Sequence, residues 1–380
     1  MESLMIPKKK VLVTGANGFI GKNLMVRLTE SPRYSIITFL RGDPIEALPN
    51  LVKKVDAVIH LAGENRPVDE NAYRQVNFGL TSSLCDAIKN TVNSSDRKIP
   101  LVFASSVQAQ VDNPYGKSKQ NAEEVIEDLA LSTGNPATIF RFPGVFGKWC
   151  KPDYNSVVAT FCFRIPRGLP IQIRDPLAAL KLVYVDDVID AIIGAADNTE
   201  GLNRANVEPE YSITLGDLAN QIELFTKSRQ SLISERVGSG FLRALYATYI
   251  SYLSHDKFCY SVVGHSDHRG IFVEMLKTQD SGQVSYFTAF PGVTRGGHYH
   301  HTKTEKFLVI KGAALFRFRN LLSDEFVQIN TSGNSPKIVD TVPGWVHDIT
   351  NVGSEEMIVM LWANENFNPI KPDTIPSKIL

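Results

Sequence analysis

A short strand that runs into a glycine-rich turn and then into a helix is the feature that most constrains the fold. The strand is residues 10–14, and a helical pattern begins at Lys22. Glycines between them let the chain turn tightly, let its backbone approach a pyrophosphate and let helix and strand pack closely. A plain βα turn can have the same spacing, so the prediction depends on the flanking strand and helix. The residues expected to contact a dinucleotide in this turn are Gly15, Asn17, Gly18, Phe19, Ile20 and Gly21.

Short β-branched strands alternate with amphipathic helical stretches from residue 11 to about residue 198. This alternation predicts a Rossmann-type α/β fold, a doubly wound parallel sheet with crossover helices. From about residue 258 onward, apolar residues alternate without long helices, and glycines and prolines interrupt the pattern. That pattern is typical of an all-β sandwich or barrel. Helices expected at 214–226 and 240–253 close the first domain or connect the two, which places the domains at 1–255 and 256–380.

The residue that follows the second predicted strand, 35–40, bears on the choice of cofactor. NAD sites commonly have an acidic residue about 20 positions after the glycine turn, where it holds the ribose hydroxyls. Here the strand ends at Arg41. A guanidinium at this place suits a 2′-phosphate, so NADPH is favoured over NADH. Asp43 close by keeps NADH open as a cofactor, and a solvated loop arginine is the alternative interpretation.

A tyrosine and a lysine four residues apart follow another predicted strand, 101–104, and a pair of serines. Tyr115 and Lys119 lie on one face of a predicted helix. There the Lys119 ammonium can lower the pKa of the Tyr115 phenol, and one of the serines, Ser105 or Ser106, can hydrogen-bond a substrate oxygen. A pair at this spacing is usually no more than an exposed helix face. After a glycine turn and two serines, however, it predicts a proton donor beside a hydride source.

The β-rich half contains a dense pattern of metal-ligand residue types. His298 and His300 alternate along a predicted strand, so both imidazoles point to one face, and a turn can return Glu305 to that face. His347 lies in a second motif, after a proline and a glycine. A histidine pair alone is more often polar surface than a metal site. Three or four nitrogen and oxygen ligands without a thiolate suit Zn, Mn, Fe or Ni and do not choose among them.

The motifs of the first half resemble those of the extended short-chain dehydrogenase/reductase family, whose members act largely on nucleotide sugars. Besides the glycine turn, the resemblance rests on residues 60–63 (HLAG), 105–106 (SS), 115–119 (YGKSK) and 184–188 (YVDDV), and it covers about residues 8–230. It implies that Tyr115 is the general acid and that Lys119 also holds the nicotinamide ribose. Ser106 matches the family's serine or threonine better than Ser105 does. The residues that the resemblance adds to the cofactor site are Leu61, Ala62 and Gly63.

Residues 258–370 resemble the two motifs of the cupin superfamily, which implies a small β-barrel with a divalent metal inside. Cupins serve many chemistries, so the barrel alone names no reaction. The run 267–274 (DHRGIFVE) is similar to one in cupins that epimerise or isomerise keto-deoxysugar nucleotides. This resemblance implies that Arg269 meets the diphosphate; a salt bridge within a strand is the alternative. Those epimerases generally use a histidine–carboxylate dyad and no metal, so the base stays unassigned among neighbours such as His301, Lys303 and Lys306.

The order of reductase and then cupin resembles bifunctional enzymes of capsular polysaccharide and O-antigen synthesis over nearly the whole chain. The resemblance implies that the cupin, with zinc as the expected metal, epimerises C3 of a UDP-4-keto-2-acetamido-2,6-dideoxyhexose. The reductase then turns the C4 ketone into UDP-2-acetamido-2,6-dideoxy-L-talose with NADPH, on the route to UDP-N-acetyl-L-fucosamine. The ketone acidifies the C3 hydrogen, and its reduction removes that acidity and traps the product.

Three other functions remain open. The chain can be a single-activity 4-ketoreductase whose cupin is structural, or a 4-epimerase or 4,6-dehydratase that recycles its NAD internally. A non-catalytic sensor of sugar nucleotides is the third, and Tyr115, Lys119 and Ser106 together speak against it.

The composition indicates no polymeric partner. Forty basic residues balance forty acidic ones, so no broad basic field for nucleic acid or an anionic membrane is expected. The four cysteines are scattered without C-x-x-C spacing, which fits a reducing cytoplasm. No export signal is visible, and the most apolar helical stretch, 241–253, is too short to span a hydrocarbon core of roughly 30 Å. By analogy with both families, we expect a homodimer.

Overall fold

The computed structural model describes residues 7–67, 69, 71–267, 270–273, 276–278, 282–323, 325–365 and 370–379. By their contacts, the residues divide into two compact units, Met1–Lys151 with Lys181–Ser212 and Pro152–Leu180 with Ile213–Leu380. The helices α7 (Leu215–Ser231) and α8 (Gly240–Ser251) therefore group with the β-rich unit. The predicted division of the chain into 1–255 and 256–380 stays a prediction.

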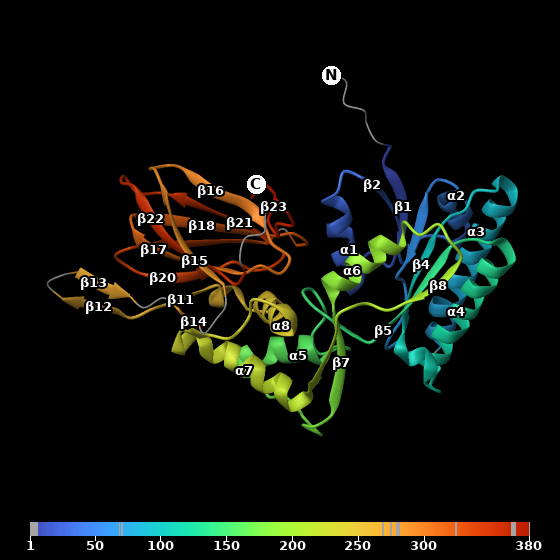
Figure 1. The fold of residues 1–380 in the computed structure, drawn as a ribbon, viewed down its shortest axis with the longest axis horizontal. Helices are drawn as coiled ribbons and strands as arrows, with labels where there is room; N and C mark the ends of the chain where they lie inside the picture. Colours follow the sequence, from blue (N-terminus) through green and yellow to red (C-terminus); the bar gives the residue numbers. More distant parts are fainter. Residues whose placement is uncertain are drawn as a thin grey trace, which may run out of the picture. The chain divides into compact units, whose positions relative to one another are not determined.

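A parallel sheet of six strands forms the centre of the first unit, in the order β2-β1-β3-β4-β5-β8 (Figure 1). Because β1 lies between β2 and β3, the chain crosses to opposite sides of β1 in its first two connections. Ligands of such sheets bind outside the carboxyl ends of the strands at this switch point. The strands are β1 (Lys9–Thr14), β2 (Tyr34–Phe39), β3 (Ala57–His60), β4 (Leu101–Ser106), β5 (Ala137–Phe142) and β8 (Leu202–Ala205).

Helices cover both faces of this sheet, as the alternating sequence pattern predicts. Figure 1 shows α1 (Phe19–Thr29) and α6 (Val185–Ala195) on one face, and α3 (Leu80–Ser95) and α4 (Pro114–Thr133) on the other. The core between the strands and the second pair of helices is fully buried and apolar, which supplies about 25 cal/mol of stabilisation per Å² removed from water. It includes Val58, Leu84, Ile88, Leu101 and Ile126. The predicted Rossmann-type fold is therefore present.

Two antiparallel five-stranded sheets build the barrel of the second unit, in the orders β11-β20-β17-β22-β15 and β19-β18-β21-β16-β23. Alternate residues of β18, such as Phe316 and Phe318, are buried, which is the period of two that the sequence predicts. The strands are β11 (Cys259–Ser261), β15 (Gln283–Ala289), β16 (Thr294–Tyr299), β17 (Glu305–Lys311), β18 (Ala313–Asn320), β19 (Phe326–Ser332), β20 (Lys337–Asp340), β21 (Trp345–Asn351), β22 (Met357–Ala363) and β23 (Ile375–Pro376).

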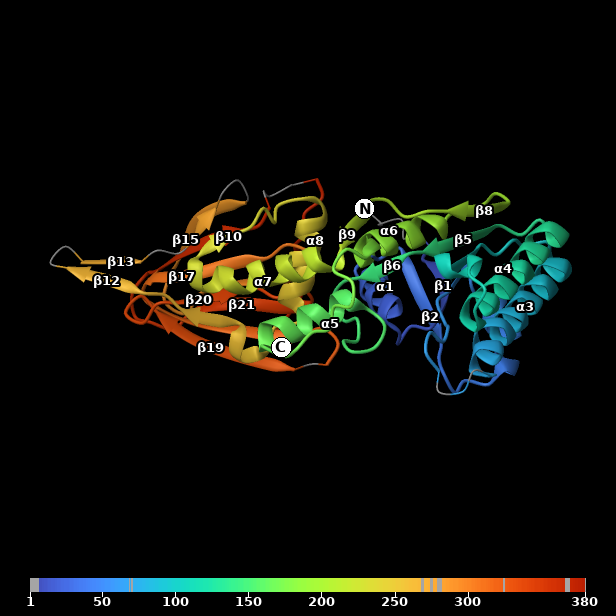
Figure 2. The ribbon, with the colours of Figure 1, turned by 90° about the horizontal axis from the view of Figure 1, so that it is seen from below.

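Helix α7 lies beside the barrel in both views (Figures 1 and 2), and Arg229 of this helix donates to Asp340 of β20 at 2.5 Å. The run that resembles keto-sugar epimerases falls on the hairpin β12 (Gly264–Asp267) and β13 (Gly270–Val273). Of that run, His268, Arg269 and Glu274 lie outside the described residues. Within the described ranges, no helix combines the length and the apolarity that crossing a membrane requires.

Candidate active site and metal centre

The glycine turn follows β1 directly and leads into α1. Gly15 has a φ of +72°, and a Cβ on it would lie 2.6 Å from the backbone nitrogen of Ala62. A Cβ on Gly21 would lie 2.1 Å from the carbonyl oxygen of Gly15. Gly18 is the N-cap of α1 and offers no side chain to cap it, so the first N–H groups of the helix are left to a ligand. A backbone cradle that admits no side chain at these positions fits a dinucleotide diphosphate, with Asn17, Phe19 and Ile20 beside it.

The predicted run Leu61, Ala62 and Gly63 follows β3 and connects the glycine turn to the lysine of α4. The backbone N–H of Leu61 donates to the Thr14 carbonyl at 3.2 Å, and that of Ala62 donates to the Thr14 hydroxyl at 3.2 Å. A Cβ on Gly63 would lie 3.3 Å from Lys119 Nζ. The structure thus brings the cofactor residues predicted from three separate segments to one edge of the sheet.

Tyr115 and Lys119 occupy the first two turns of α4. The helix begins there because Asn113 caps it, accepting from Gly116 N at 2.8 Å, and because Pro114 occupies its first position. Lys119 is buried and donates to the carbonyl of Ala104 at the end of β4 at 2.8 Å. Burial lowers the pKa of Lys119 to about 8, opposed by the negative charge of Glu123.

We expected the ammonium of Lys119 to lower the pKa of the Tyr115 phenol, but the structure gives the opposite direction. Burial of the phenol raises the pKa of Tyr115, and a hydrogen bond with the Ser106 side chain opposes this only in part. Desolvation of the phenol therefore outweighs the hydrogen bond that favours its ionised form. The phenol stays protonated at neutral pH, which is the form that a proton donor requires.

The two serines at the end of β4 have different surroundings. Ser105 is buried and donates to the carboxylate of Glu123, which also pairs with Arg141 at 2.6 Å. Ser106 instead interacts with Tyr115 and accepts from Gln108 N at 3.2 Å. Ser105 thus belongs to a structural network, and Ser106 is the serine that lies with the tyrosine.

Arg41, which we expected to meet a 2′-phosphate, forms an ion pair with Glu64. The arginine side chain is 84% exposed and that of Glu64 17% exposed, so the guanidinium lies at the surface beside the run 61–63. Asp43, the alternative ribose partner, accepts from Leu40 N at 2.7 Å. Its carboxylate therefore stabilises the turn after β2.

Asn77 is a buried residue near this site that sequence reasoning missed. It lies on the π-helix η2 (Tyr73–Gly79), accepts from Glu64 N at 2.7 Å and donates to Glu64 O at 3.0 Å and to Ser118 Oγ at 2.9 Å. Its amide therefore fixes the loop that carries Glu64 to the helix that carries Lys119. A single asparagine in a helical stretch gives no periodic signal, so the sequence offered no means to identify it.

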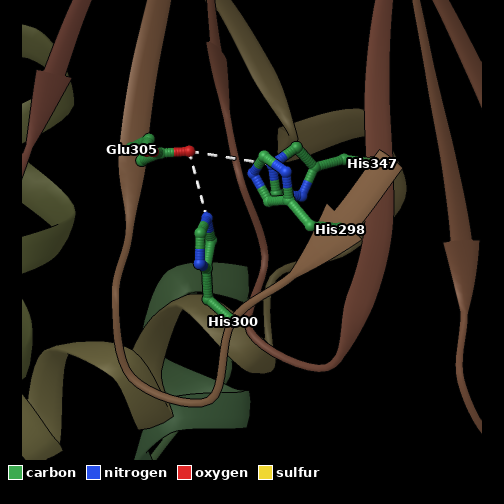
Figure 3. Close-up of side chains that lie close together, drawn as sticks. All are labelled: His298, His300, Glu305 and His347. Carbon is green, nitrogen blue, oxygen red and sulfur yellow. Dashed lines mark hydrogen bonds and ion pairs between the residues drawn. The ribbon is translucent and has the colours of Figure 1, made fainter. Parts of the chain in front are cut away.

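The four predicted metal ligands come together inside the barrel (Figure 3). One ligand atom from each residue lies within 4.8 Å of the others. His298 of β16 and His347 of β21 are cross-strand partners, and Glu305 begins β17, so two facing sheets supply the donors. Burial lowers the pKa of His298 to about 3 and also lowers that of His347, which keeps both imidazoles neutral. Neutral imidazoles and a carboxylate are suitable donors for a divalent cation.

The hydrogen-bond pattern of the cluster shows that a cation fits it. The Nδ1 of His300 faces the carbonyl oxygen of Asp373, which can only accept, so Nδ1 carries the proton. The other ring nitrogen, Nε2, lies 3.1 Å from Glu305 Oε2, so both atoms face the space between the four ligands. His347 Nε2 lies 3.7 Å from Glu305 Oε2, beyond hydrogen-bond distance, and among the described residues neither of its buried ring nitrogens has a hydrogen-bond partner. A cation between these residues would be coordinated by one ligand atom from each, including one ring nitrogen of His347.

Two of the three candidate bases lie beside the metal ligands, and the third does not. Lys303 Nζ lies 2.8 Å from Glu305 Oε1, and His301 is buried in the same turn. Lys306 does not belong with them. It follows Glu305 on β17, so its side chain points to the opposite face, where it pairs with Asp340 at 2.7 Å.

Comparison with known proteins gives concordant results along the chain. Residues 11–207 match the NAD dependent epimerase/dehydratase family, and residues 265–375 match the polysaccharide biosynthesis C-terminal domain. The chain is 54% identical over 368 residues, 96% of its length and 97% of the relative's, to the UDP-2-acetamido-2,6-beta-L-arabino-hexul-4-ose reductase of Pseudomonas aeruginosa.

Solved structures agree with this relationship. The capsular polysaccharide assembling protein CapF from Staphylococcus aureus superposes with a TM-score of 0.63 at 37% identity, covering 97% of this chain and 99% of that one. A UDP-N-acetylglucosamine 4-epimerase from Bacillus cereus, 21% identical with a TM-score of 0.51 over 58% of this chain and 82% of its own, shares the fold. The chain therefore belongs to the NAD dependent epimerase/dehydratase family, with a polysaccharide biosynthesis C-terminal domain that forms a cupin-like β domain.

Proposed function

We propose that this protein is a bifunctional nucleotide-sugar enzyme. Its barrel epimerises C3 of a UDP-4-keto-2-acetamido-2,6-dideoxyhexose, and its first unit reduces the C4 ketone with NADPH to UDP-2-acetamido-2,6-dideoxy-L-talose, toward UDP-N-acetyl-L-fucosamine. One observation carries the proposal: a chain 54% identical along nearly its whole length to a UDP-keto-sugar reductase also holds a buried cluster of three histidines and a glutamate. The reductase alone has no use for that cluster.

In the reduction, Ser106 and Tyr115 hold the oxygen of the C4 ketone. NADPH, when bound, would supply the hydride; the NAD dependence of the family supports a nicotinamide cofactor at this site. As negative charge develops on the oxygen, Tyr115 donates its phenolic proton, which its raised pKa keeps in place at neutral pH. With a pKa of about 8, Lys119 is charged at neutral pH and stabilises the phenolate that remains.

In the epimerisation, His298, His300, Glu305 and His347 would hold a divalent cation, and we propose zinc. Such a cation would supply positive charge beside a substrate oxygen on which negative charge develops. The C3 hydrogen is acidic because it lies next to the C4 ketone, so a base beside the cluster can remove it. His301 and Lys303, on the turn between two ligands, are the candidates for this base. Reprotonation on the opposite face inverts C3.

The preference for NADPH rests on Arg41, the cationic side chain at the end of β2. We further propose that the enzyme works as a homodimer in the cytoplasm, with the UDP-sugar as its partner and no nucleic acid or membrane. Balanced charge supports the absence of nucleic acid and membrane, and scattered cysteines support a reducing cytoplasm. The homodimer rests on analogy with both families.

The test is to incubate the protein with the UDP-4-keto sugar in deuterated water, with and without NADPH. We expect deuterium at C3 without NADPH, and a reduced product with it. His298→Ala should abolish the exchange and spare NADPH oxidation, whereas Tyr115→Phe should do the reverse. If NADPH is oxidised without C3 exchange, the chain is a 4-ketoreductase whose barrel is structural.

A further inference from the structure

The C-terminal segment, residues 370–379, lies across the turn that connects two of the candidate metal ligands. Its strand β23 pairs with β16, with His298 opposite Pro376 and Tyr299 opposite Ile375. Asp373 precedes this pairing and lies 73 positions from His300 in the sequence. A segment remote in the sequence therefore contacts the cluster directly.

The carboxylate of Asp373 accepts hydrogen bonds from three consecutive backbone N–H groups. Its oxygens lie 2.8 Å from His301 N, 2.6 Å from Thr302 N and 2.7 Å from Lys303 N, with the Thr302 hydroxyl at 3.0 Å. Successive N–H groups that converge on one anion form a concave binding site, and bonds to an ionised acceptor are about twice as strong as neutral ones. The carboxylate thus fixes the conformation of the turn 301–303.

This turn sets the separation of two metal ligands. His300 precedes it, and Glu305 follows it as the first residue of β17. The backbone carbonyl of Asp373 also accepts from His300 Nδ1, which orients the ring so that Nε2 lies 3.1 Å from Glu305 Oε2. One residue therefore fixes both the loop between the ligands and the orientation of a ligand ring.

We propose that Asp373 is a positioning residue for the metal centre, and that the C-terminal segment is a strap that holds His300 and Glu305 in the geometry that binds the cation. This inference rests on the metal site of the proposed function. Removing a group that orients a metal ligand typically weakens metal binding by about 10- to 100-fold. Loss of the strap contact should therefore release the metal faster without altering the reductase site.

The test uses the full-length protein loaded with Zn²⁺, and measures both the affinity for zinc and its rate of transfer to a chromophoric chelator. We expect Asp373→Ala to weaken zinc binding by roughly 10-fold or more. Asp373→Asn, which keeps the shape and one acceptor oxygen, should fall between it and the wild type. Ile379→Ala is the matched control, because it removes a buried contact from the same segment and leaves the Asp373 contacts in place.

Three outcomes overturn the proposal. The first is a zinc affinity equal to that of the wild type in folded Asp373→Ala, and the second is such an affinity in Asp373→Asn if the alanine variant does not fold. The third is a loss of zinc affinity in Ile379→Ala as large as in the Asp373 variants. Failure of the wild-type protein itself to bind zinc is a separate result that overturns the metal site. Co²⁺ in place of zinc gives a second readout, since its visible absorption reports ligand geometry independently of turnover.

Discussion

Arg41 has a partner within the protein that competes with the 2′-phosphate predicted to bind it. Glu64 forms an ion pair with it where a 2′-phosphate would bind. Glu64→Gln removes the competing carboxylate, so we expect NADPH to bind more tightly, by roughly two- to fivefold, which is the range typical of an exposed ion pair. Affinity for NADH should not change. Titration of each cofactor by its fluorescence measures both values without substrate.

Arg41→Ala supplies the control for this effect. It should lower the preference for NADPH over NADH, and in that background Glu64→Gln should have no further effect, because the two side chains act through one pair. Equal tightening of NADH by Glu64→Gln would contradict a role in recognising the phosphate.

His60 connects three elements of the first unit. From β3, its Nδ1 lies 2.6 Å from the Thr14 hydroxyl of β1, and its Nε2 lies 2.8 Å from the Thr81 hydroxyl of α3. Burial lowers the pKa of His60 to about 3, with the charge of Lys119 as a second cause. An unfolded histidine has a pKa of about 6.5. The unfolded state therefore takes up a proton first as pH falls, and the stability present above pH ~6.5 is lost toward pH ~3.

His60→Gln tests this dependence, because glutamine can still donate and accept between the two threonines. We expect the variant to be less stable at pH 7.5, and the difference in free energy of unfolding from the wild type to shrink below pH ~6.5. The largest slope is about 1.4 kcal/mol per pH unit. Urea unfolding at pH 7.5, 6.5 and 5.5 measures the difference. A constant difference over this range would show that His60 does not titrate on unfolding.

At the scale of elements, the sequence predicts those features that the spacing of nearby residues encodes. Three features each occupy a short window of the sequence: the glycine turn between β1 and α1, the Tyr115–Lys119 pair on α4, and the ligands from His298 to Glu305. The period of two along β17 also predicts that Lys306 points away from Glu305, which excludes it from the candidate bases. Asp373 and Glu64 are different, because their partners come from other segments and only the tertiary fold brings them together.

At the scale of the whole molecule, contacts between separate segments also hold the second unit together. The pattern of strands and helices predicted a barrel preceded by helices, and the structure contains both. Arg229 of α7 nevertheless donates to Asp340 of β20 at 2.5 Å, and Asp340 also pairs with Lys306 at 2.7 Å. All three side chains are at most 12% exposed. No sequence period predicts such a pairing, because its members lie on separate elements.

Buried charges require partners, so we expect the network of Arg229, Asp340 and Lys306 to make α7 contribute to the stability of the barrel. Arg229→Met leaves Asp340 with Lys306 alone, and we expect a loss of about 3 kcal/mol, the low end for breaking a buried pair. The barrel tryptophans Trp345 and Trp362 report its unfolding in urea.

Lys227→Met is the matched control on the same helix: its pair with Glu223 is exposed, so its loss should change stability by less than about 1 kcal/mol. Equal stability of the two variants would mean that α7 packs on the barrel without stabilising it. A loss of stability confined to Arg229→Met, with NADPH affinity unchanged, would show that the helix and the barrel unfold together.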